Sequence, residues 1–232
     1  LTMCGIVGYV GRSAATPVLL GGLRRLEYRG YDSAGISLQD GKELLTVRAV
    51  GKVARLADKV RADWPEARQS RCVVGIAHTR WATHGAPTEA HPHADATGRI
   101  RLVHNGIIEN YRALRAKLEA KGHVFASETD TEAVARLVGE YYKGDLRKAV
   151  ISALRQVEGA YGIAVISADE PGRIVVARKG SPLVIGVGEG ECLIASDPSA
   201  IISHTRRVIY LDDGDVAVVT AASSQGCRPS AQ

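Results

Sequence analysis

The sequence predicts an α+β fold in which two mainly antiparallel sheets carry helices on their outer faces. Three observations support this prediction: β-rich runs open the chain, amphipathic helices fill its middle, and short strands separated by tight turns follow. Strands joined by tight turns pair antiparallel, and helices outside two sheets bury the apolar faces of both kinds of element. The 232 residues contain no internal repeat and no linker, so we expect one domain.

The first part of the chain predicts two helices among five strands. A glycine-bounded β-rich run at residues 5–10 is the first strand. Thr16 followed by Pro17 is typical of a helix N-cap and first helical position, and Gly30 is the expected stop. Further elements are expected in this order: strands at 34–39 and 43–50 joined by an Asp40-Gly41 turn, a helix at 53–61, and strands at 72–79 and 99–104.

The middle of the chain predicts three helices. Ile107 begins an apolar stripe that continues to Leu118 and predicts the first helix. Residues 129–132, Thr-Asp-Thr-Glu, have the pattern of a capping box that opens the second, and the third is expected to start at Asp145. Later strands are expected at 161–167, 173–178, 183–187, 191–195, 207–211 and 215–220, with a short helix at Asp197-Pro198.

Composition excludes several classes of function. The hydrophobic fraction of 45% and charged fraction of 24% are typical of soluble globular proteins. The net charge of +5 comes from scattered basic residues without an interleaved aromatic run, so we expect no nucleic-acid partner. We expect no membrane partner, because neither a bilayer-length apolar stretch nor a signal peptide is present. Four widely spaced cysteines, Cys4, Cys72, Cys192 and Cys227, are consistent with a cytoplasmic protein.

The two ends of the chain differ in character from the rest. Residues 1–3, Leu-Thr-Met, are interpreted as a leader or cloning remnant, with Met3 as the natural start. Residues 221–232 are small and polar without periodicity, so we expect a disordered tail. The predicted domain therefore spans residues 4–220.

Cys4 directly follows the candidate initiator methionine. A cysteine at a strand start is commonly just a small buried hydrophobic side chain. Removal of Met3, however, would leave an α-amine with a pKa of about 7.7–8.0 beside a thiol with a pKa of about 8.5. That amine can accept the thiol proton and deliver it to a leaving group, so one residue supplies nucleophile, base and acid. An amide nitrogen cannot, so retention of residues 1–3 predicts an inactive binding protein.

Three further polar positions suit acyl transfer from an amino-acid substrate. Asn105-Gly106 offers a side-chain amide and an unhindered backbone N–H to an oxyanion, although Asn-Gly is also a turn signal. Arg80 could bind a carboxylate with its planar fork, and Asp130 could bind an ammonium group. Asp130 could also complement the dipole of the helix that it begins.

The histidines raise the alternative of a metal-dependent hydrolase. His91 and His93 form a His-x-His pair with Asp95 close behind, and His78, His84 and His104 lie nearby in the sequence. A His-x-His pair is a weak signal for zinc, and hydrogen-bonded or surface histidines explain it more simply. We therefore expect no metal.

The motifs together resemble the glutaminase half of the glutamine–fructose-6-phosphate aminotransferase (glucosamine-6-phosphate synthase) family of N-terminal-nucleophile amidotransferases. The resemblance extends from Cys4 to about Thr220. The segments that carry it, in this order, are residues 4–8, 26–35, 75–85, 104–110, 127–132 and 180–186.

The resemblance implies a four-layer α/β/β/α sandwich, the N-terminal nucleophile hydrolase fold. It implies hydrolysis of the side-chain amide of L-glutamine to glutamate and ammonia through a cysteinyl acyl-enzyme, without a cofactor. The implied roles are Cys4 as nucleophile, Asn105 and Gly106 as oxyanion donors, Arg80, Thr83, His84 and Asp130 as glutamine ligands, Trp81 at the ammonia exit, and Arg29 as support of the closing loop.

Family members continue into a sugar-isomerase domain that binds fructose 6-phosphate and consumes the ammonia. No segment after Thr220 could form that domain. We therefore expect this chain to release free ammonia rather than to make glucosamine 6-phosphate, and a homodimer could form through the missing domain. The alternative is an inactive glutamine-binding fragment if residues 1–3 are retained.

Overall fold

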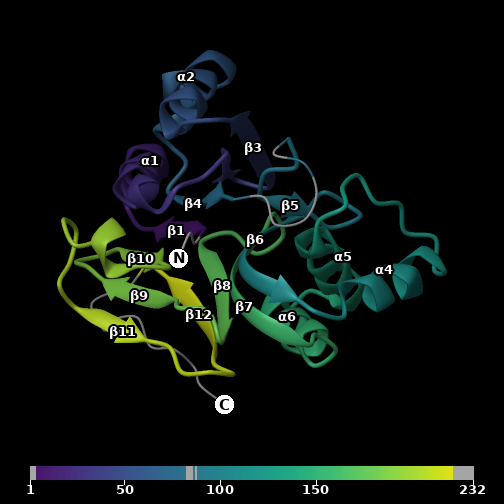
Figure 1. The fold of residues 1–232 in the computed structure, drawn as a ribbon. Helices are drawn as coiled ribbons and strands as arrows, with labels where there is room; N and C mark the ends of the chain where they lie inside the picture. The colour runs from purple at the N-terminus through teal and green to yellow at the C-terminus, as the bar shows by residue number, and fades with distance from the viewer. Residues whose placement is uncertain (1–3, 82–85, 87, 222–232) are drawn as a thin grey trace.

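The computed structural model describes residues 4–81, 86 and 88–221, and it has two antiparallel sheets with helices on their outer faces (Figure 1). Figure 1 shows helices α1 and α2 on one side of the molecule and α4, α5 and α6 on the other. The order of layers is helices, sheet, sheet, helices. The prediction of an α+β, four-layer sandwich is therefore confirmed.

The first sheet has seven strands in the order β11-β9-β10-β1-β4-β2-β3. Its strands are β1 (Gly5–Val10), β2 (Ser33–Asp40), β3 (Glu43–Val50), β4 (Val74–Arg80), β9 (Val184–Val187), β10 (Cys192–Ala195) and β11 (Val208–Tyr210). Strand β1 lies at the centre, paired with β10 on one side and β4 on the other. Strand β1 is buried along its whole length, so the backbone position of Cys4, the residue that precedes it, is fixed.

The second sheet has five strands in the order β12-β8-β7-β6-β5. Its strands are β5 (His93–Ala94), β6 (Ile100–Ile108), β7 (Gly159–Ser167), β8 (Arg173–Lys179) and β12 (Val216–Thr220). The pairing of β6 with β7 runs from Ile100 opposite Ser167 to Ile108 opposite Gly159. This long pairing fixes the register of the residues at the end of β6.

Apolar clusters hold the four layers together. The helices are α1 (Ala15–Leu26), η1 (Glu27–Arg29), α2 (Val53–Asp63), α3 (Glu66–Gln69), α4 (Tyr111–Glu119), α5 (Asp130–Tyr141), α6 (Leu146–Leu154) and η2 (Pro198–Ala200). Leu19 and Leu56 of α1 and α2 pack on the seven-stranded sheet. Val134 and Val150 of α5 and α6 pack on the five-stranded sheet. A third cluster lies between the sheets and includes Ile6, Ile76, Val103, Ala164 and Ile174.

Two of the predicted helix starts are confirmed. The Thr129 hydroxyl accepts the N–H of Glu132 at 3.2 Å, and Asp145 accepts the N–H of Lys148 at 2.9 Å. The second half of the capping box differs from expectation. Glu132 accepts the N–H of Ser127 at 2.7 Å, and the Thr129 N–H donates instead to the Ser127 hydroxyl.

The predicted N-cap of the first helix is wrong. Helix α1 begins at Ala15, its N-cap is Ala14, and no side chain caps it. The N–H of Ala15 donates instead to the carbonyl of Cys72 at 2.8 Å. This bond to the neighbouring chain segment fixes the helix start ahead of Thr16, so tertiary structure overrides the local signal.

The predicted placement of Ile107 in a helix is also wrong. Strand β6 continues through Asn105 and Gly106 to Ile108, and Ile107 is 47% exposed. Pairing along β7 overrides both the turn signal of Asn-Gly and the apolar stripe, and α4 begins only at Tyr111. Two short elements, β5 and α3, were not predicted because two or four residues carry no periodic pattern.

No helix in the described ranges is both long enough and apolar enough to cross a lipid bilayer.

Candidate active site

Cys4 lies directly before β1, at the edge of the seven-stranded sheet. The next two residues are anchored through their backbone: Gly5 N–H donates to the Thr79 hydroxyl and Ile6 N–H to the Ser196 hydroxyl, both at 3.0 Å. The Cys4 sulfur accepts the backbone N–H of Trp81 at 3.2 Å. The sulfur is therefore held between β1 and the end of β4.

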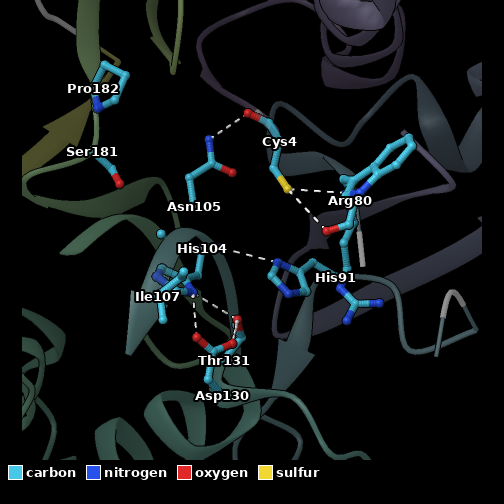
Figure 2. Close-up of a pocket in the computed structure, with 12 residues that line it drawn as sticks. Cys4, Arg80, His91, His104, Asn105, Ile107, Asp130, Thr131, Ser181 and Pro182 are labelled. Atoms are coloured by element: carbon cyan, nitrogen blue, oxygen red, sulfur yellow. Dashed lines mark hydrogen bonds and ion pairs between the residues drawn. The ribbon is translucent and has the colours of Figure 1, made fainter. Parts of the chain in front are cut away.

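A cavity of about 240 Å³ opens at Cys4 (Figure 2). The residues that line it are Cys4, Arg80, Trp81, His91, His104, Asn105, Gly106, Ile107, Asp130, Thr131, Ser181 and Pro182. They come from the start of β1, the ends of β4 and β6, the start of α5 and the segments before β5 and β9. Six of the residues predicted from sequence, namely Cys4, Arg80, Trp81, Asn105, Gly106 and Asp130, are thus brought together around one space.

The Asn105 side chain is oriented by two hydrogen bonds. Its Nδ2 donates to the backbone carbonyl of Cys4 at 2.9 Å, and its Oδ1 lies 2.8 Å from Nε2 of His78. The residue is 7% exposed, so little of it contacts solvent. An amide held in this way can present its second N–H to an oxygen that develops charge beside Cys4.

Gly106 follows in the same strand with a φ of 131°. A Cβ atom at this position would lie 2.1 Å from the carbonyl oxygen of Ala160 on the paired strand β7. Only glycine therefore permits this close pairing, and Gly106, which has no side chain, lines the cavity with its backbone.

Asp130 is the first residue of α5 and is largely buried. Its Oδ2 accepts the N–H of Ile108 at 3.0 Å, and its Oδ1 accepts the Thr131 hydroxyl at 3.3 Å. The helix N-terminus also favours a negative charge here. The cavity therefore contains a fixed anionic group.

Arg80 ends β4 and is 4% exposed. Its Nη1 donates to the carbonyl of Ala86 at 2.7 Å. A guanidinium at the cavity wall supplies the cationic group that complements Asp130. The two predicted ligands for the ends of an amino acid thus line the same cavity.

The surroundings of Cys4 favour the neutral form of its thiol. Burial raises its pKa above the usual range, and this effect exceeds the opposing effects of the Trp81 N–H and the Arg80 charge. A thiol with a raised pKa needs a base to become a nucleophile. The Trp81 N–H can then stabilise the thiolate as it forms.

The histidines form a buried, neutral group. The rings of His78 and His91 stack at 4.2 Å between centroids, and His91 and His93 meet edge to face at 4.9 Å. Burial lowers the pKa of His78 and of His93 to about 3, and it lowers the pKa of His91 well below its usual value. Among the described residues no group of three or more His, Cys, Asp or Glu is placed to hold a metal ion.

Arg29 lies apart from the residues that line the cavity. Its guanidinium pairs with Asp197 at the start of η2, and its Nε donates to the Tyr28 hydroxyl at 3.3 Å. Its predicted support of a closing loop stays a prediction. Thr83 and His84 lie outside the described residues, as do residues 1–3 and 222–232.

Several cavity residues were not assigned by sequence reasoning. Ser181 and Pro182 precede β9, and they belong to the 180–186 segment that carries the resemblance. Thr131 lies next to the predicted ligand Asp130, so the capping-box pattern contained it. His104 alone does not indicate a site residue in the sequence, but its position in a strand directly before Asn105 does.

The chain matches the family model described as a glutamine amidotransferase domain over residues 78–203. It is 53% identical over 227 residues to a glutamine–fructose-6-phosphate aminotransferase (isomerizing) of Chlorobaculum tepidum, covering 95% of this chain and 36% of the relative. It is 55% identical over 220 residues to an enzyme of the same name from Thermus thermophilus, covering 94% of this chain and 35% of the relative. The chain thus spans about a third of the length of these relatives.

A solved structure has the same fold. It is the glutamine phosphoribosylpyrophosphate amidotransferase from B. subtilis complexed with ADP and GMP, which superposes with a TM-score of 0.79 at 25% identity. The match covers 94% of this chain and 47% of that one. The match to the family model covers more than half of this chain. The chain belongs to the family of glutamine amidotransferase domains.

Proposed function

We propose that this domain hydrolyses the side-chain amide of L-glutamine to glutamate and ammonia through a thioester on Cys4. One observation carries the proposal. The Cys4 sulfur lies in a cavity that also contains the Asn105 amide, the guanidinium of Arg80 and the carboxylate of Asp130. A nucleophile, an oxyanion donor and a ligand for each charged end of an amino acid are thereby combined in one site.

The reaction proceeds by acyl transfer. The α-amine of Cys4, when this residue is the first of the chain, accepts the thiol proton as sulfur attacks the amide carbon of glutamine. The carbonyl oxygen becomes an anion, which the Asn105 Nδ2–H and the Gly106 N–H stabilise. The C–N bond breaks and the amine returns its proton to ammonia. Water then hydrolyses the thioester, releasing glutamate and restoring the thiol.

Substrate orientation follows from charge. Arg80 binds the α-carboxylate, because a planar guanidinium matches a carboxylate with two donors. Asp130 binds the α-ammonium group and is kept in place by the Ile108 N–H. Thr83 and His84 contribute further contacts, Trp81 lies at the ammonia exit and Arg29 supports the closing loop. No cofactor takes part.

The relatives' names indicate the use of the ammonia. They are called glutamine–fructose-6-phosphate aminotransferases, and this chain covers about a third of them. We infer that the domain supplies ammonia for glucosamine 6-phosphate synthesis on a sugar-isomerase domain, in the cytoplasm. A homodimer would form through that domain. Neither nucleic acid nor membrane is a partner.

The deciding experiment compares two forms of the protein. The form that begins at Cys4 should release glutamate and ammonia in equal amounts, measured by a coupled glutamate assay. The form that keeps residues 1–3 should bind glutamine without hydrolysing it, because its Cys4 nitrogen is an amide and not a base. Equal hydrolysis by both forms would rule out the α-amine mechanism.

A further inference from the structure

His78 is a buried polar side chain that the mechanism above does not use. It lies on β4, is 0% exposed, and does not line the cavity. Its Nε2 lies 2.8 Å from the Oδ1 of Asn105. A histidine enclosed in this way cannot exchange protons with substrate, so its contact with Asn105 is the feature that requires an explanation.

The Asn105 amide can be placed in only one orientation. The backbone carbonyl of Cys4 accepts hydrogen bonds and donates none, so the nitrogen of the amide must face Cys4. The amide oxygen then faces His78 and can only accept a hydrogen bond. His78 must therefore donate through Nε2. The orientation of the amide and the tautomer of the imidazole are determined together by one carbonyl group.

The surroundings of His78 agree with this tautomer. Its Nδ1 has no hydrogen-bond partner among the described residues, so no acceptor there requires the proton to sit on Nδ1. The ring stacks on His91, and the strand is paired on both sides, opposite Ile6 and Gly35. The donor is therefore held rigidly, and it remains a donor whether or not the ring is charged.

We propose that His78 is a positioning residue for the amide hydrolysis: its Nε2–H holds the Asn105 oxygen away from Cys4, so that the amide N–H faces the developing oxyanion. This inference rests on the proposed function. Without the donor, the amide can rotate and bring its oxygen toward the oxyanion, where like partial charges repel. His78 then acts on kcat through Asn105 and leaves glutamine binding unaffected.

The test replaces His78 by side chains whose N–H donor lies at the former position of Nε2, at that of Nδ1, or is absent. In His78→Gln the side-chain nitrogen reaches the position of Nε2, whereas in His78→Asn it reaches only that of Nδ1. His78→Leu provides no donor. All variants are made in the form that begins at Cys4. Loss of one oxyanion donor lowers kcat by about 10²–10³-fold, and Cys4 still favours the correct orientation, so we expect a loss of roughly 10–100-fold in the Leu and Asn variants.

His78→Gln should keep kcat within about threefold of the parent, and KM for glutamine should stay nearly constant in all three variants. A purely structural role predicts instead that the Asn and Gln variants behave alike. In the Asn105→Ala background, His78→Leu should have no further effect on kcat, because the group that it positions is absent. An independent, additive loss would overturn the proposal.

His123 provides the control. Its Nε2 lies 3.1 Å from Glu140 and its Nδ1 has no partner among the described residues, so its bonding resembles that of His78 at a position away from the cavity. His123→Leu should leave kcat unchanged while it lowers thermal stability. A similar fall in kcat in this variant would show that the effect is general destabilisation.

Failure of the proposed function and failure of the positioning role can be distinguished. If the unsubstituted form that begins at Cys4 does not hydrolyse glutamine, the proposed function fails. If that form is active and His78→Leu is equally active, only the positioning role fails. If the variants do not fold, nitrogen NMR of the parent protein decides. A proton on Nε2 of His78, with bare Nδ1, supports the proposal, and a proton on Nδ1 alone overturns it.

Discussion

The layer between the two sheets has an apolar end and a polar end, and the same strands build both. On β4 the residues that face this layer change from Val74 and Ile76 to His78 and Arg80. On β6 the change is from Val103 to Asn105. Side chains alternate along a strand, so these residues share one face. The site is therefore a continuation of the core in which aliphatic contacts are replaced by paired polar groups.

A different contribution to the free energy of folding dominates at each end of this layer. At the apolar end each fully buried aliphatic side chain contributes about 1.5–3 kcal/mol. At the polar end a buried group costs free energy unless a partner satisfies it. Asn105 satisfies this condition through Cys4 and His78. Changes at the polar end should therefore alter catalysis first, and changes at the apolar end should alter stability first.

The largest expected effect is that of Cys4→Ala at the polar end. Without the sulfur no thioester forms, so we expect glutamate release to fall to the uncatalysed background. The binding groups Arg80 and Asp130 remain, so glutamine binding, measured by calorimetry, should be largely kept. Undiminished turnover would contradict the nucleophile assignment.

Much of the fold and of the site could be predicted before the structure. Thr129 and Asp145 mark helix starts by local hydrogen bonds, which depend only on neighbouring residues. Cys4 was recognisable from its position after Met3. The contact of His78 with Asn105 was not predicted, because it depends on how two sheets stack. Alternation places both residues on inward faces, but the sequence alone does not set the register between β4 and β6.

Gly106→Ala tests whether backbone pairing positions the site. The new Cβ would meet the Ala160 carbonyl at 2.1 Å, and its φ of 131° is strained for alanine. We expect the end of β6 to separate from β7, a loss of kcat of about 10–100-fold as the oxyanion donors shift, and a lower melting temperature. A variant with normal kcat and stability would contradict the close pairing.

Acidification tests the buried histidines. Folding lowers the pKa of His78 and of His93 to about 3, so below pH ~6.5 the unfolded chain binds more protons than the folded one. Stability is therefore fully present above pH ~6.5 and falls as pH decreases toward 3, by at most ~1.4 kcal/mol per pH unit for each histidine. Denaturant unfolding at pH 7 and pH 5 measures this. His93→Gln should reduce the dependence of the free energy of unfolding on pH. An unchanged dependence would contradict the contribution of His93.

Arg80→Lys tests the planar fork. A lysine keeps the charge but replaces the two parallel donors of the guanidinium by one point charge, so it cannot bind a carboxylate through a planar pair of hydrogen bonds. We expect KM for glutamine to rise by roughly tenfold with a smaller change in kcat. An unchanged KM would show that Arg80 does not bind the substrate carboxylate.

The smallest expected effect is on stability, and it differs between two neighbouring glycines of α1, the helix that packs on the outer face of β1. Close packing of α1 against the sheet requires a glycine at position 22 and not at position 21. A Cβ at Gly22 would lie 2.8 Å from Cγ1 of Val7, whereas a Cβ at Gly21 would meet nothing within 4 Å. Gly21→Ala should therefore raise the free energy of unfolding by about 0.5–1 kcal/mol through helix propensity. Gly22→Ala should lower it, because Val7 is fixed in the central strand and cannot move away; equal effects in the two variants would contradict this difference in packing.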